Sequence, residues 1–62
     1  MNEIAVTILV FCNSLGTIDG YSKKDIVDAC EVAMWACLMQ KKTTHYCKQS
    51  TKLEFIEIRD GQ

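Results

Sequence analysis

The sequence lacks proline altogether and has only 3 glycines among its 62 residues. This scarcity excludes long flexible linkers and proline-rich recognition segments. Long apolar runs are lacking too: the stretch 29–39 is interrupted by Glu31 and is about half as long as a helix that spans a bilayer. We therefore expect neither a membrane-spanning segment nor a membrane partner.

An excess of charge of either sign is also missing. Lys+Arg 7 against Asp+Glu 8 gives a net charge of −1, which removes the broad positive field of a general nucleic-acid binder. The sequence has 1 histidine, and a chain this short has little room for the substrate cleft that a Cys–His nucleophile also requires. We expect no enzyme, no catalytic residue and no cofactor.

What is present is apolar content of 48%, which indicates a folded domain. We predict a single domain over residues 1–62. A domain of this size has a marginal core unless a metal, disulfides, dense packing or a second copy supports it.

The segment 3–12 is rich in β-branched side chains, and Ile4, Val6 and Ile8 recur at period two. No positive charge precedes this apolar run and no small-residue cleavage site follows it, so the pattern predicts a strand rather than a signal peptide. Without a secretion signal, we expect a cytoplasmic protein with free thiols. The thiols in question are Cys12, Cys30, Cys37 and Cys47.

A helix is predicted over 23–40. Ser22 and Asp25 are spaced like the two partners of a capping box at its start. Lys41 and Lys42 at its end complement the helix dipole. This segment is the clearest secondary-structure signal in the chain.

Turn-forming residues dominate 13–20, where a short strand around Thr17 is an option. After the helix, 43–47 and 52–59 have strand composition, and 48–51 is interpreted as a loop. The predicted fold class is α+β: one long helix packed on a small two- or three-stranded sheet, in the order β-α-β-β or β-β-α-β.

The predicted helix has two apolar faces. One carries small residues typical of a core, among them Cys30 and Ala33. The opposite face carries a stripe flanked by two acids, and the residues of this candidate partner-binding surface are Val32, Trp35, Met39, Asp28 and Glu31.

Two interpretations of this stripe are open. An extra strand, or the loop 13–20, covers it within the chain. Alternatively it binds another protein, as a homodimer seam or a docking site. We favour the second interpretation because Trp and Met are enriched in interface cores, and because so small a domain cannot cover two helix faces.

A second candidate site is a basic patch after the helix, formed by Lys41, Lys42, His45, Tyr46, Lys48 and Lys52. Its aromatic ring could stack on a base. This gives the alternative function, a small nucleic-acid-binding regulator. The simpler interpretation is a solvated helix end.

The sequence offers little for a metal. His45 and Cys47 share a face if their segment is a strand, and Cys12 could add a third ligand, but a CxxC pair and a second histidine are lacking. Cys30 and Cys37 lie about 10 Å apart along a helix, too far to share a metal or a disulfide. We predict no metal site.

Four features together resemble, in general style, small phage-encoded α+β proteins that bind and inhibit host enzymes. They are the β-branched strand, the Ser22-x-x-Asp25 start, the helix pattern Ala29-x-x-x-Ala33-x-Trp35, and the closing strand from Leu53 to Arg59. The resemblance implies a phage or mobile-element protein, anti-defence proteins included, that occludes a site on a larger protein without catalysis. The predicted function is thus a non-enzymatic, dimeric protein-interaction module that inhibits or regulates a larger protein.

Overall fold

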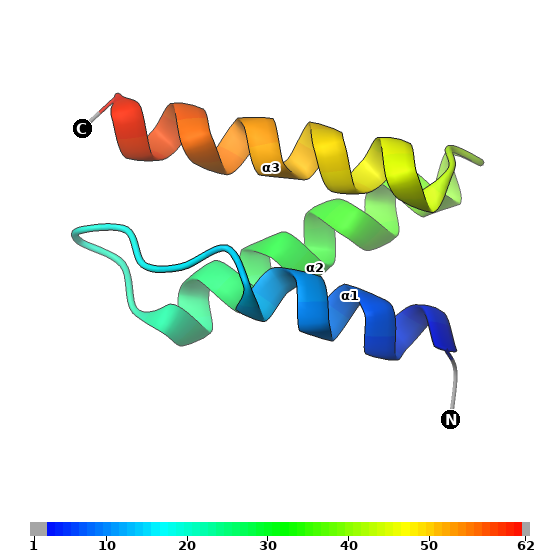
Figure 1. Ribbon diagram of the computed structural model, residues 1–62, viewed down its shortest axis with the longest axis horizontal. Helices are drawn as coiled ribbons and strands as arrows, with labels where there is room; N and C mark the ends of the chain where they lie inside the picture. The colour runs from blue at the N-terminus through cyan, green and yellow to red at the C-terminus, as the bar shows by residue number, and fades with distance from the viewer. Residues whose placement is uncertain (1–2, 62) are drawn as a thin grey trace.

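The computed structural model describes residues 3–61 and consists of three helices, α1 (Glu3–Asn13), α2 (Lys23–Met39) and α3 (Thr44–Asp60) (Figure 1). Within residues 3–61 there is no strand. The α+β prediction is therefore wrong, and with it the small sheet: the fold is all-α.

Helix α2 confirms the predicted helix to within one residue. The Ser22 hydroxyl accepts a hydrogen bond from the Asp25 N–H at 3.1 Å and so caps the first turn. At the other end, the N–H groups of Gln40 and Lys41 donate to the carbonyls of Cys37 and Leu38 at 3.1 and 2.9 Å. Local capping chemistry alone was sufficient to place this element.

Helix α1 replaces the predicted strand at 3–12. The run is apolar on nearly every side, so period two and a helical period fit it equally well. In the structure Ile8 and Cys12, one helical turn apart, are both about 1% exposed, whereas Val10 is 65% exposed. A β-branched residue costs less than about 0.7 kcal/mol in a helix, and burial of one face of α1 against α2 offsets that cost.

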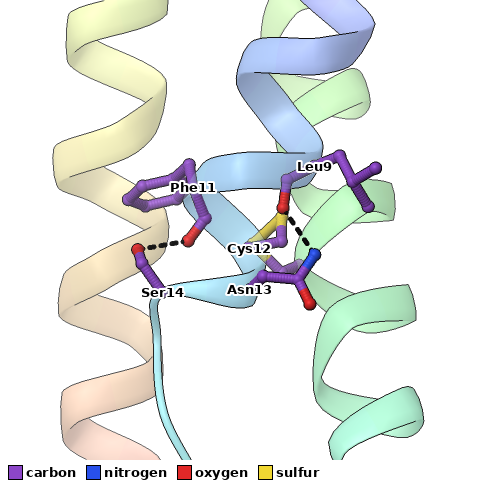
Figure 2. The surroundings of a disulfide bond; sticks show 6 residues. Leu9, Phe11, Cys12, Asn13 and Ser14 are labelled. Atoms are coloured by element: carbon purple, nitrogen blue, oxygen red, sulfur yellow. Dashed lines mark hydrogen bonds between the residues drawn. A yellow bond between two sulfur atoms is a disulfide. The ribbon is translucent and has the colours of Figure 1, made fainter.

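The end of α1 is closed by its own side chains (Figure 2). The Asn13 amide donates to the Leu9 carbonyl at 2.8 Å. The Ser14 hydroxyl donates to the Phe11 carbonyl at 2.6 Å. The Ser14 N–H donates to the same Phe11 carbonyl at 3.0 Å, so backbone and side-chain bonds together close the last turn of α1.

Helix α3 replaces the predicted strands at 43–47 and 52–59 and the predicted loop at 48–51. Thr43 is its N-cap, and its hydroxyl accepts from the Tyr46 N–H at 3.1 Å. Every fourth residue faces the core: Cys47, Thr51 and Phe55 are all buried. That spacing is helical, and it passes through the segment that we interpreted as a loop.

The cysteines form two disulfides and none of the four is free, so the prediction of free thiols is wrong. Cys12 of α1 bonds Cys30, with Cα atoms 5.6 Å apart. Cys37 bonds Cys47 of α3, with Cα atoms 5.8 Å apart. Cys30 and Cys37 do not bond each other, in agreement with their distance of about 10 Å along the helix, and each pairs with a cysteine of a different helix.

The disulfides determine how the helices are arranged. Cys30 and Cys37 are seven residues apart, about two turns, and therefore lie on one side of α2. Helices α1 and α3 both pack mainly on α2 and contact each other little. The molecule is thus a two-layer structure, with α1 and α3 in one layer and α2 in the other (Figure 1).

The core lies between these layers. Its apolar members come from all three helices and from one loop residue, and they are Ile8, Cys12, Ile18, Ile26, Cys30, Met34, Cys47 and Phe55. Three of the eight side chains are cysteines, and only three, all isoleucines, are large and aliphatic. A core this small leaves the fold dependent on its cross-links.

Reducing both disulfides should therefore unfold the protein. Closing the loops between bonded cysteines, with sequence separations of 18 and 10, stabilises a fold by about 3 kcal/mol each in the chain-entropy model. Their sum, about 6 kcal/mol, is comparable with the whole stability of a small domain. Circular dichroism with and without a thiol reductant measures the effect, and a helical signal unchanged by complete reduction would contradict it.

Candidate functional site

The outer side of α2 carries exposed apolar side chains. Val32, Trp35 and Met39 are 70%, 40% and 82% exposed. They lie roughly 140–200° around the helix from Cys30, on the side that faces away from α1 and α3. We call these three residues the outer stripe.

Acidic side chains flank the N-terminal end of the outer stripe. Asp28 is exposed and pairs with Lys24 across one turn, with Nζ and Oδ2 3.5 Å apart. Glu31 is half-buried. The five residues predicted as a partner-binding surface thus lie on α2 with an exposed apolar centre and negative charge at one end, and their role in binding stays a prediction.

The interpretation in which an extra strand or the loop 13–20 covers this surface is wrong. The loop turns toward α3 instead: its Ile18 is 4% exposed. Ile18 lines a small apolar cavity of about 100 Å³ together with Ile26, Phe55 and Ile58. Within residues 3–61, nothing is folded over the outer stripe.

The geometry also holds the outer stripe rigid. Cys30 and Cys37 fix the inner side of α2 to α1 and to α3. The stripe lies on the same two turns of helix as these cysteines, but on the opposite side. Because the backbone of a cross-linked helix is already ordered, it loses little conformational entropy on binding, which favours affinity.

The predicted basic patch is divided between two surfaces. The Lys42 ammonium lies 5.5 Å from the centre of the Tyr46 ring, and both residues line a shallow cavity between α2 and α3. Lys48 and Lys52 instead lie on the side of α3 that faces α1. Lys41 follows the end of α2 in a left-handed conformation, φ 63°.

The remaining member, His45, is exposed in the first turn of α3. Because His45 and Cys47 are two residues apart on a helix and not on a strand, they lie on different sides of it. Cys47 is buried in its disulfide. Residues 3–61 contain no cluster of three or more side chains suited to hold a metal ion.

Sequence reasoning missed a groove between α1 and α3. Two adjoining cavities of about 420 and 400 Å³ share Phe11 and Ser14 as lining residues. Figure 2 shows Phe11 pointing from α1 toward α3. One end of the groove is held by Arg59, whose guanidinium donates to the Leu15 carbonyl at 2.6 Å. A helical interpretation of 44–60 would have placed Lys48, Lys52 and Arg59 on one side and exposed this feature.

No helix in the described part of the chain has the length and apolar character needed to cross a membrane. Comparison with protein-family models, with curated proteins and with solved structures finds no match.

Two methionines of α2 test the assignment of inner and outer sides. Met34 is 0% exposed and Met39 is 82% exposed. Met34→Ala should lower the free energy of unfolding by about 2–4 kcal/mol, whereas Met39→Ala should change it by no more than about 0.5 kcal/mol. Denaturant unfolding of the two variants measures the difference, and equal losses would show that the outer stripe is packed and not free.

Proposed function

We propose that this chain is a small, non-enzymatic protein-interaction module that binds its partner through the outer stripe and thereby inhibits or regulates a larger protein. The observation that carries the proposal is the exposure of Val32, Trp35 and Met39 on a helix cross-linked on its other side. Exposed Trp and Met grouped on one face are typical of interface cores.

The spacing of the outer stripe supports a particular binding mode. Its residues stand at i, i+3 and i+7, the positions by which an amphipathic helix anchors itself in the apolar groove of a partner. Asp28 and Glu31 add negative charge beside the anchors. A partner groove with apolar walls and positively charged edges matches this face.

A non-enzymatic role fits the side chains available. The cysteines, which are the strongest nucleophiles in the sequence, are all held in disulfides. The outer stripe itself has no group that could act as a nucleophile or as a general base. Inhibition by occlusion needs neither, because it depends only on covering a surface of the larger protein.

The alternative function, nucleic-acid binding by the basic residues after α2, has less support. The six candidate residues do not form one surface, since Lys42 and Tyr46 lie between α2 and α3 while Lys48 and Lys52 face α1. Backbone binding requires several cations along one track.

Replacing two anchors should abolish partner binding and leave the fold intact. Val32→Gln/Met39→Gln keeps good helix formers on exposed positions, so helical content and thermal unfolding should stay close to those of the parent. Affinity capture from the native host, with quantitative mass spectrometry, measures binding. Leu53→Gln is the matched control, since Leu53 is 59% exposed but lies on α3.

The expected result is a partner retained by the parent and by Leu53→Gln but lost by the double variant. If the double variant captures the same proteins as the parent, the outer stripe is not the binding surface.

A further inference from the structure

The groove between α1 and α3 combines apolar walls with positive charge, and its chemistry mirrors that of the outer stripe. Its α1 wall includes Val6, Val10 and Phe11, and its α3 wall includes Phe55 and Ile56. The charged side chains that line it are Lys48, Lys52 and Arg59. Among the described residues, none that lines either half of the groove is acidic.

Within residues 3–61, the positive charge of the groove is not balanced by an ion pair. Lys48 and Lys52 are one turn apart on α3, a spacing at which like charges repel. The salt bridge formed within residues 3–61 is Lys24–Asp28, which involves neither lysine. The Arg59 guanidinium is directed to a neutral carbonyl, that of Leu15. A ligand with negative charge beside an apolar face would satisfy both features of the groove.

We propose that the ligand of this groove is the outer stripe of a second copy of the chain. The inference rests on the proposed function, because it uses the same face of α2 and identifies a partner for it. In this arrangement Val32, Trp35 and Met39 of one copy fill the apolar groove of the next, and Asp28 and Glu31 lie beside its lysines.

The two surfaces match in length as well as in charge. Asp28 to Met39 spans eleven residues, about 16 Å of helix, and Lys48 to Arg59 spans the same. When Asp28 and Glu31 are placed beside Lys48 and Lys52, Trp35 lies about 8 Å along the α2 axis from the midpoint of the two acids. The same distance along α3 separates the midpoint of the two lysines from Phe55 and Ile56, which line the groove beside Lys52.

The contact is head-to-tail, because the outer stripe belongs to the α2 layer and the groove to the α1–α3 layer (Figure 1). After a first contact, the pair of copies therefore keeps one free stripe, on one copy, and one free groove, on the other. Such heterologous contacts form rings or open chains, not a closed symmetric dimer. Assembly size should rise with protein concentration and fall with added salt, which screens the charge pairs at the rim.

One-sided variants test this arrangement in sedimentation velocity, at concentrations up to about 1 mM so that weak contacts are detected. Val32→Gln/Met39→Gln removes the stripe and leaves the groove. Lys48→Glu/Lys52→Glu reverses the groove charge and leaves the stripe. Lys48→Arg/Lys52→Arg is the matched control, since it retains the charge. Circular dichroism verifies that each variant is folded.

The parent and the Arg control should associate, and each one-sided variant alone should associate at least about tenfold more weakly. Mixing the two one-sided variants should restore a single 1:1 complex and nothing larger, because only one complementary pair of surfaces remains. A symmetric stripe-to-stripe dimer cannot give this result.

Three outcomes would overturn the inference. A parent that stays monomeric throughout the range leaves the groove to some other acidic ligand. If the groove variant associates as well as the parent and the stripe variant does not, the groove is not the surface that binds the outer stripe. The proposed function is unaffected by this result. A stripe variant that associates like the parent rules out the outer stripe as the self-association surface. The proposed function is then judged separately: it holds if the same variant no longer captures the host protein, and it fails if capture is unchanged.

Discussion

The structure depends on two cross-links that meet on one side of one helix. Cys30 and Cys37 are seven residues apart, so they lie on the same side of α2, and each bonds a different helix. Every other feature of the arrangement follows from this. Helices α1 and α3 must lie in one layer, the core must lie between that layer and α2, and the far side of α2 must face away from both.

This constraint explains why so small a chain exposes apolar side chains on both layers. The α2 side chains that point away from the disulfides have no second layer to cover them, and Val32 and Met39 are 70% and 82% exposed. In the other layer, α1 and α3 are held by α2 and not by each other, so Val10 remains 65% exposed beside their groove. The cross-links provide stability that a larger core would otherwise supply, and this frees apolar surface for binding.

The sequence predicted those elements whose signals are local. Ser22 and Asp25 predicted the start of α2, and helical spacing placed Val32, Trp35 and Met39 on one face, where all three are exposed. The all-α fold was missed because β-branched residues in α1 suggested a strand, while tertiary packing of Ile8 and Cys12 decided for a helix. In α3 the helical pattern is present in the sequence: Cys47, Thr51 and Phe55 recur every fourth residue, which is typical of one buried helix face.

The prediction of free thiols was wrong because the state of the cysteines was inferred from the expected compartment and not from geometry. Helical spacing excluded a bond between Cys30 and Cys37, but that same spacing made both available to cysteines elsewhere in the chain. The prediction of free thiols followed from that of a cytoplasmic protein, which rested on the lack of a secretion signal. The location stays a prediction, and two disulfides give it no support. The binding surfaces are tied to the same chemistry. If the disulfides are reduced, α2 is no longer held to either neighbour, and both the outer stripe and the groove lose the arrangement that makes them complementary.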